Sequence, residues 1–319
     1  MSTEIIRAED QSLAAAPQAI TPDLYGRYIS FLDASPKTAE TYSKALRQMF
    51  KYFSLNGIKT PTRADIVAFR EDLKASGHKP TTVSNYMAAV RLFFTWTEQE
   101  KLYPNIAQHI KGAKLDREHK RDYLTSGQVK NVLEIVERDT LRGARDYAIL
   151  TLMITGGLRT IELSRANIED LRALGDNTAL YIQGKGHEEK TDYVKISAPV
   201  ERALREYLKA RGDARPEDPL FISLSNNSKR ERLTTRALSG IVKQRLQAAG
   251  YNSPRLTAHS MRHTAVTLSL LAGKDLAEVQ QFARHANIAT TMIYNHALEK
   301  AQNSCAEAVS SAIFDSMQA

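Results

Sequence analysis

Cysteine and long hydrophobic runs are nearly missing from this sequence. The single cysteine, Cys305, allows no internal disulfide and is typical of proteins from a reducing compartment. No stretch approaches the roughly 18 consecutive apolar residues that suggest a transmembrane helix. The opening residues carry acids and only a weak apolar run, unlike a secretory signal. We therefore expect a cytoplasmic protein without a membrane partner.

Glycine and proline are also scarce, at 15 and 10 of the 319 residues, which excludes collagen-like and low-complexity chains. Hydrophobic residues make up 42% of the chain and charged residues 25%, the balance of a packed globular protein. Since domains commonly take about 100–200 residues each, the length predicts two domains.

Positive charge exceeds negative charge. The chain has 44 Lys and Arg against 36 Asp and Glu, a net charge of +8. Residues 1–20 hold one base, Arg7, and three acids, so the excess lies in the rest of the chain, for example at 111–114 and 229–232. A basic balance favours a polyanionic partner such as nucleic acid. Solubility alone accounts for a charge of this size equally well.

Changes in composition divide the chain into four segments. Residues 1–20 are expected to form a flexible acidic tail, and residues 112–122 are polar, basic and aperiodic, as in a linker. Residues 21–111 show helical periodicity. Start signals and spacing predict a bundle of four helices near 24–32, 36–56, 62–74 and 80–96. The aromatic stripe of this bundle is interpreted as core rather than as a platform for stacking bases.

The fourth segment, 123–319, is expected to be a larger domain. Its pattern predicts helices at 128–137 and 142–155, then a break at 155–159 that opens another helix. Residues 179–183 and 192–198 alternate with period two around Gly184–His187, which predicts a hairpin. Helical patterns return from Val200 onward. The expected fold class is mainly α with a small antiparallel β hairpin or sheet (α+β).

Polar side chains that could take part in a reaction or bind a ligand occur in three clusters. Arg159 and Glu162 lie three residues apart at a predicted helix start, where a local ion pair is the simplest interpretation. His259, Arg262 and His263 are spaced to project from one side of a helix. The third cluster begins at residues 283–285 and continues through 290–296.

The spacing of His259 and His263 raises the possibility of zinc, but other features argue against a metal. Ser260 stands where a metalloprotease motif places its glutamate, and Arg262 would set a fixed cation beside the metal. One cysteine also excludes a Cys-pair site. Binding of phosphate fits better, since Arg offers paired donors and His a donor that titrates. The sequence 184–186 lacks the spacing of a nucleotide-binding P-loop. No metal or cofactor is expected.

Six residues, taken in chain order with their surroundings, resemble the site of one family. They are Arg159, Lys185, His259, Arg262, His285 and Tyr294. The matching stretches are TGGLRTIEL at 155–163, GKG at 184–186, HSMRHT at 259–264 and YNH at 294–296. With the intervening hairpin and the helical bundle, the chain from about residue 21 to 300 resembles the tyrosine recombinases, the phage integrase and Xer family. Three positions depart from the family pattern: Ala283 and Arg284, since Ala283-Arg284-His285 stands where Leu-Gly-His is frequent, and Met261, where Leu is frequent.

The resemblance implies a two-domain DNA clamp, with a SAM-like core-binding domain at 21–111 and a catalytic domain at 123–319. It implies an enzyme that cleaves and rejoins DNA through a 3′-phosphotyrosyl intermediate, without a cofactor. The implied nucleophile is Tyr294, although any one tyrosine is most simply a packing residue. The implied partners of the scissile phosphate are Arg159, Arg262 and His285, with Lys185 as general acid and His259 as general base or as a further phosphate-binding residue. Glu162 and His263 are implied in support.

The resemblance also implies partners. They are double-stranded DNA with paired near-palindromic sites, and further copies of the chain in a tetramer joined through residues 297–319, with room for accessory proteins. Candidate DNA contacts, each of which taken alone fits an ordinary surface charge better, are Lys44, Arg47, Lys79, Thr81, Arg91, Lys114, Lys229, Arg230, Arg232 and Lys243.

Two other functions stay open at this point: a catalytically silent DNA-binding regulator on the same fold, and a topoisomerase-like enzyme that acts without paired sites. Within the recombinase interpretation, the role is integration or excision of a mobile element, or Xer-like resolution of dimers. The short segment before the bundle leads us to expect a compact system without an arm-binding domain. The extra length of the chain favours the mobile element slightly.

Overall fold

The computed structural model describes residues 19–114, 122–184, 189–301 and 303–314. The chain forms two compact units, Met1–Arg117 and Glu118–Ala319. Most of the expected tail and linker lies outside the described residues. None of the helices within the described ranges has both the length and the apolar character needed to cross a membrane.

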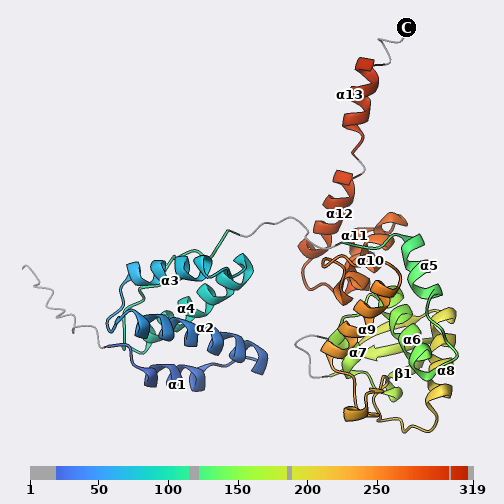
Figure 1. The fold of residues 1–319 in the computed structure, drawn as a ribbon, viewed down its shortest axis with the longest axis horizontal. Helices are drawn as coiled ribbons and strands as arrows, with labels where there is room; N and C mark the ends of the chain where they lie inside the picture. Colours follow the sequence, from blue (N-terminus) through green and yellow to red (C-terminus); the bar gives the residue numbers. More distant parts are fainter. Residues whose placement is uncertain (1–18, 115–121, 185–188, 302, 315–319) are drawn as a thin grey trace, which may run out of the picture. The chain divides into compact units, whose positions relative to one another are not determined.

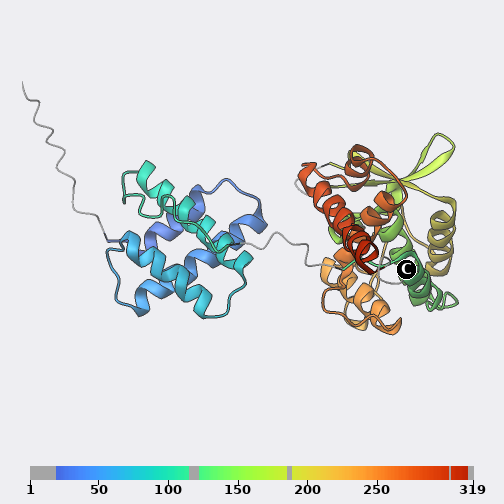
Figure 2. The same ribbon diagram turned by 90° about the horizontal axis from the view of Figure 1, so that it is seen from above.

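The first unit contains the four expected helices, which lie together in Figures 1 and 2. They are α1 (Pro22–Phe31), α2 (Pro36–Leu55), α3 (Arg63–Ala75) and α4 (Pro80–Gln99). Local chemistry sets their starts: prolines stand in the first turns of α1, α2 and α4, and the Ser35 hydroxyl accepts the Thr38 N–H at 3.3 Å. The Thr62 N–H and hydroxyl both donate to the Asp65 carboxylate at the start of α3.

Aromatic side chains fill the core of the first unit, as expected from the sequence. Phe93 of α4 is fully buried, with its ring centroid 5.4 Å from that of Tyr28 and 5.8 Å from that of Phe50. The segment after α4 packs back on the bundle, since the Tyr103 hydroxyl donates to the Pro61 carbonyl at 2.6 Å and Arg91 donates to the Ile110 carbonyl at 2.7 Å. These rings therefore stabilise the bundle by burial and edge-to-face contact.

The second unit is built around α6 (Leu141–Gly156), which packs against α8, α9 and α10. Its described helices further include α5 (Ser126–Glu134), α7 (Thr160–Arg165), α8 (Ala198–Arg211), α9 (Thr235–Ala248), α10 (Ala258–Leu271), α11 (Leu276–Ala283), α12 (Ala289–Ala301) and α13 (Cys305–Phe314). Short 3₁₀ turns occur at Ile168–Asp170 and Asn226–Ser228. The prediction of a helix at 128–137 was displaced by two to three residues, because a Thr125–Gln128 capping box starts the helix earlier.

Three antiparallel strands form one sheet in the order β1-β2-β3: β1 (Leu171–Leu174), β2 (Asn177–Ile182) and β3 (Asp192–Ile196). The predicted hairpin is confirmed as β2 and β3, with Leu180 opposite Val194 and both side chains buried. The prediction that the second strand reaches residue 198 was wrong, because Pro199 opens α8 there. Strand β1 was missed, since none of its residues is fully buried and it lacks the alternation that marks a strand.

A buried ion cluster joins α6 to α9. The Asp146 carboxylate accepts from Arg145 at 2.8 Å and from Arg245 of α9 at 2.6 Å. Asp146 and Arg145 are almost without exposure, so each charge depends on the others for compensation. This contact holds α9, which contributes Ser239 to the pocket described below, against the central helix.

Gly143 in the first turn of α6 provides a test of how closely this turn packs on the backbone of Glu137. A Cβ at this position would lie 1.6 Å from the backbone oxygen of Glu137. We expect Gly143→Ala to lower the free energy of unfolding by about 2 kcal/mol or more, because backbone must move. Gly127→Ala is the control, since its Cβ would meet no atom within 4 Å and alanine favours the helix. Equal urea stability of the two variants would contradict this packing.

Candidate active site

The turn between α6 and α7 places the first site residue. Gly157 ends α6 with φ +56°, a backbone region that favours glycine, and a Cβ there would lie 3.2 Å from the ring of Phe282. Arg159 follows as the residue that precedes α7. The turn therefore requires glycine at position 157, whereas a Cβ at Gly156, the last residue of α6, would lie 2.8 Å from Val194.

Arg159 and Glu162 form the expected local pair. The Arg159 backbone N–H donates to Glu162 Oε2 at 2.7 Å, and Arg159 Nη1 donates to Oε1 at 2.9 Å. Glu162 has no exposed surface, whereas the Arg159 side chain is 28% exposed. Burial works to raise the pKa of Glu162, but the charge of Arg284 and the hydrogen bonds from Arg159 outweigh it and leave this pKa lowered. The carboxylate therefore stays ionised and orients Arg159.

Arg262 enters from α10 and is 1% exposed. Its Nη1 donates to the Gly157 carbonyl at 2.6 Å, and its Nη2 donates to the Ala283 carbonyl at the end of α11. Burial, followed by the charges of Arg159 and Arg284, lowers the pKa of Arg262 to about 9. This side chain thus links the turn before α7 to the end of α11.

His285 follows α11 and is buried. Its Nδ1 lies 2.9 Å from the hydroxyl of Thr291, a fully buried residue of α12. Burial first, and then the charges of Arg262 and Arg159, lower the pKa of His285 to about 4. The imidazole is therefore neutral near pH 7 and donates from one nitrogen only.

Tyr294 of α12 is 6% exposed and lies among histidines. Its ring centroid is 4.8 Å from that of His263 and 6.1 Å from that of His285, with the latter pair stacked. His263 in turn lies 5.1 Å from His259, ring to ring. The predicted placement of His259 and His263 on one helix face is confirmed. Through His263, the ring of His259 is linked to the ring of Tyr294.

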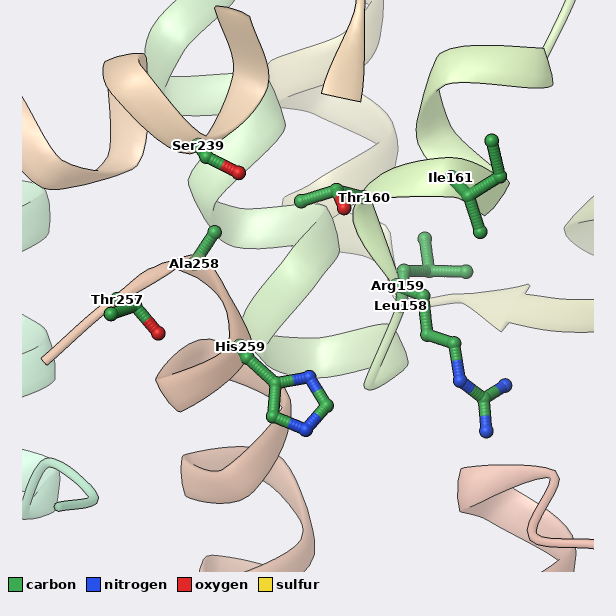
Figure 3. Close-up of a pocket in the computed structure, with 8 residues that line it drawn as sticks. All are labelled: Leu158, Arg159, Thr160, Ile161, Ser239, Thr257, Ala258 and His259. Atoms are coloured by element: carbon green, nitrogen blue, oxygen red, sulfur yellow. The ribbon is translucent and has the colours of Figure 1, made fainter. Parts of the chain in front are cut away.

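A pocket of about 320 Å³ opens between α7, α9 and the start of α10. It is lined by Leu158, Arg159, Thr160, Ile161, Ser239, Thr257, Ala258 and His259. Figure 3 shows His259 and Arg159 entering it from different sides, His259 from α10 and Arg159 from the turn before α7. Within the residues that the structure describes, no group of three or more His, Cys, Asp or Glu is arranged to hold a metal ion. The pocket offers cationic and neutral hydrogen-bond donors, which suit a phosphate group.

The structure brings together every predicted catalytic residue that it describes. Lys185 lies outside the described residues. Eight of the candidate DNA contacts are exposed, and the other two, Arg91 and Lys243, are partly buried. The exposed residues are Lys44, Arg47, Lys79, Thr81, Lys114, Lys229, Arg230 and Arg232. Five of the ten donate to backbone carbonyls of their own unit: Arg47 to Ser43, Arg91 to Ile110, Arg230 to Asp213, Arg232 to Ser164 and Ala166, and Lys243 to Ser253 and Leu256.

Two residues of the site received no role from the sequence. Thr291 contacts His285, and the pair of threonines at 290–291 between His285 and Tyr294 was the available signal. Arg284 was noted only as a departure from the family pattern, with assistance and solvent exposure both left open. Its guanidinium instead contacts Glu162 at 3.0 Å.

Family comparisons match both units. The profile "Phage integrase family" matches residues 122–301, and the profile "Phage integrase, N-terminal SAM-like domain" matches residues 23–101. The first of these covers more than half of the chain and all described members of the candidate site.

Individual proteins are similar over most of their length. Tyrosine recombinase XerC of Roseiflexus castenholzii is 32% identical over 243 residues, 74% of each chain. Tyrosine recombinase XerD of Oceanobacillus iheyensis is 30% identical over 273 residues, 82% of this chain and 88% of that protein. The solved structure of the XerH site-specific recombinase bound to a palindromic difH substrate has a TM-score of 0.69 at 25% identity, covering 84% of this chain and 80% of that one.

The lowered pKa of His285 predicts a loss of stability in acid. The unfolded chain takes up a proton near the ordinary value of 6.5, whereas the folded site resists protonation down to about 4. Stability from this group is therefore complete above pH 6.5 and falls by up to about 3 kcal/mol as the pH drops to 4. His285→Gln should flatten that part of the curve of unfolding free energy against pH. His296→Gln, at a side chain that is 67% exposed, is the control, and parallel curves for wild type and His285→Gln would refute the assignment.

Proposed function

The chain belongs to the phage integrase family of tyrosine recombinases, and on that premise we propose that Tyr294 is the nucleophile of its strand-cleavage site. The protein is a site-specific DNA recombinase, an enzyme that cleaves and rejoins DNA. The observation that carries the proposal for the site is the stacking of the buried Tyr294 ring on His285, in a unit where Arg159 and Arg262 are held by bonds to Glu162 and Gly157. His259 lies ring to ring with His263, which contacts Tyr294.

The proposed reaction is a transesterification. The Tyr294 oxygen attacks the scissile phosphorus, the bond to the 5′-oxygen breaks, and a 3′-phosphotyrosyl link and a free 5′-hydroxyl remain. A phenol has an ordinary pKa near 10, so His259 takes its proton during attack. Lys185, on the β2–β3 connection, gives a proton to the departing 5′-oxygen. One phosphodiester replaces another, so the reverse reaction rejoins the strand without a cofactor.

Charge on the phosphate grows during attack, and fixed donors stabilise it. Arg159 and Arg262 are proposed to bind the non-bridging oxygens, and neutral His285 to donate one hydrogen bond. Arg262 and Tyr294 are almost unexposed, and the terminal nitrogens of Arg262 bond backbone carbonyls. Contact with a phosphate therefore requires the end of α11 and α12 to shift when DNA binds.

Both units are proposed to contact the DNA, the first through its SAM-like bundle and basic residues such as Lys44 and Lys79. The related XerH is bound to a palindromic site, and we extend this to paired near-palindromic sites for the present chain. The biological role is either movement of a mobile element or Xer-like dimer resolution, and the location of the cleaved site distinguishes them.

Tyr294→Phe tests the nucleophile. Wild type incubated with genomic DNA of the source cell should give protein–DNA adducts that resist SDS, and the variant should give none while binding DNA with unchanged affinity. Tyr123→Phe, at an exposed tyrosine of the same unit, is the control and should form adducts like wild type.

Sequencing the attached DNA ends gives the remaining outcomes. One short near-palindromic site in wild-type adducts supports site-specific recombination by Tyr294. Adducts scattered over the genome would support a topoisomerase-like activity instead. Adducts that persist in Tyr294→Phe would assign the nucleophile to another residue.

The C-terminal segment 297–319 is proposed to join copies of the chain into a tetramer on paired sites. Every described side chain of α13 is exposed, including the apolar Val309, Ile313 and Phe314. Apolar side chains grouped on an exposed helix indicate a surface that another molecule covers.

Truncation after Lys300 tests this assembly. The shortened protein should bind a single site with an affinity within about twofold of wild type but fail to bring two sites together, because most of the proposed joining surface is removed. A truncation after Phe314, which keeps α13, is the control. Sedimentation on paired-site DNA measures the assembly, and normal recombination by the Lys300 truncate would show that the segment is dispensable.

A further inference from the structure

Arg284 has a backbone conformation that is unusual for its residue type. It ends α11 with φ 52° and ψ 48°, in the left-handed region that glycine enters freely and other L residues enter at a cost. Strained positions of this kind persist where surrounding contacts hold them, and they concentrate at functional sites. The contacts of the side chain explain what holds Arg284.

The side chain of Arg284 is 11% exposed, and its guanidinium spans the turn before α7. Its Nη2 donates to Glu162 Oε2 at 3.0 Å and to the Gly157 carbonyl at 3.1 Å. Its Nη1 donates to the Phe282 carbonyl at 2.9 Å and to the Gly156 carbonyl at 3.4 Å. The fork of a guanidinium suits this arrangement, since a single ammonium cannot reach as many acceptors.

Two of these acceptors, Glu162 and the Gly157 carbonyl, also contact a residue of the proposed catalytic set. Glu162 Oε2 accepts from the Arg159 backbone at 2.7 Å while Oε1 accepts from Arg159 Nη1. The Gly157 carbonyl accepts from Arg262 at 2.6 Å. The Arg284 carbonyl itself accepts from Arg159 Nη2 at 3.4 Å. Arg284 thus bonds Arg159 directly through its carbonyl and shares the Gly157 carbonyl with Arg262, the two arginines that are proposed to bind phosphate.

Arg284 also changes the charge of the site. Without it, the buried Glu162 carboxylate would balance Arg159, and Arg262 alone would remain in excess. With it, three guanidinium groups face one carboxylate, a net charge of about +2. A phosphodiester attacked by a phenolate carries about two negative charges, so the arrangement matches the state in which charge has grown.

We propose that Arg284 is a positioning residue for strand cleavage, which holds the Glu162 carboxylate and the Gly156–Gly157 turn so that Arg159 and Arg262 stay directed at the phosphate. This role rests on the proposed active site. It is distinct from DNA affinity, because Arg284 contacts the scissile phosphate only through other residues. It is also distinct from a purely structural role, because the backbone alone would be better served by glycine.

Arg284→Gly is the test, since glycine suits the left-handed conformation and removes every side-chain contact. We expect the single-turnover rate of adduct formation on a nicked suicide substrate to fall about tenfold to hundredfold, the cost typical of misplaced catalytic groups. The dissociation constant for the same DNA should stay within about twofold of wild type, because contacts along the rest of the duplex are unchanged. Arg284→Lys, which keeps the charge but not the fork, should give an intermediate rate.

Lys101→Gly is the matched control. Lys101 is an exposed cationic residue with φ 55° in the first unit, so the change removes a similar charge from a similar backbone conformation. Its cleavage rate should equal that of wild type. Thermal unfolding of each variant identifies any that fails to fold. If Arg284→Gly does not fold, the cleavage rate of Arg284→Lys tests the proposal in its place.

A double-mutant cycle with Glu162→Gln separates positioning from general weakening. If Arg284 acts through the carboxylate, the rate of the double variant should lie close to that of the slower single variant instead of the product of the two losses. Wild-type rates in a folded Arg284→Gly, or fully multiplicative losses in the cycle, would overturn the proposal while leaving the active site intact. Absence of adducts from wild type itself would instead refute the active site on which the proposal rests.

Discussion

The buried carboxylate of Glu162 is the constraint on which the site depends. It has no exposed surface, and an unpaired charge in such a place is strongly unfavourable. Two guanidinium groups compensate it, Arg159 from its own helix and Arg284 from the end of α11. A third, Arg262, is buried close to them, and burial followed by the charges of the other two lowers the pKa of Arg262 to about 9. Three like charges can share this small volume because Glu162 and the backbone carbonyls of the Gly156–Gly157 turn lie among them.

The fold supplies these partners from segments far apart in the chain. The central helix α6 ends at the Gly156–Gly157 turn, α10 passes beside it with Arg262 and the two histidines, and α11 ends there with Arg284 and His285. Helix α12 then brings Tyr294 and Thr291 against the histidines. The burial that lowers the pKa of His285 also leaves Tyr294 almost unexposed. In this structure, therefore, a phosphate cannot reach the Tyr294 hydroxyl unless the surrounding elements move. Catalysis at the proposed site therefore requires movement at the end of α11 and in α12.

Sequence patterns predicted the helices well because their signals are local. Proline in the first turn, Ser35 and the Thr62–Asp65 pair act within one turn of helix, and α2, α3 and α4 begin within one residue of where those signals predict. Strand β1 was missed for the opposite reason, since it pairs through its backbone and exposes much of its surface. The sequence also did not predict that Arg91, Arg232 and Lys243 donate to carbonyls of their own unit, because the acceptors lie on other elements.

By itself, the sequence determined the four helices of the first unit, the β2–β3 hairpin, the basic balance of the chain, and the identity and order of the residues that resemble a recombinase site. Signals from residue type and spacing extend over only a few positions of the chain, so they can be recognised without a structure. Only the tertiary structure decided that Glu162 is buried between two arginines, that Thr291 partners His285, and that Arg284 turns inward rather than toward solvent. These outcomes depend on which surfaces exclude water from one another, and burial of that kind is a property of the packed fold alone.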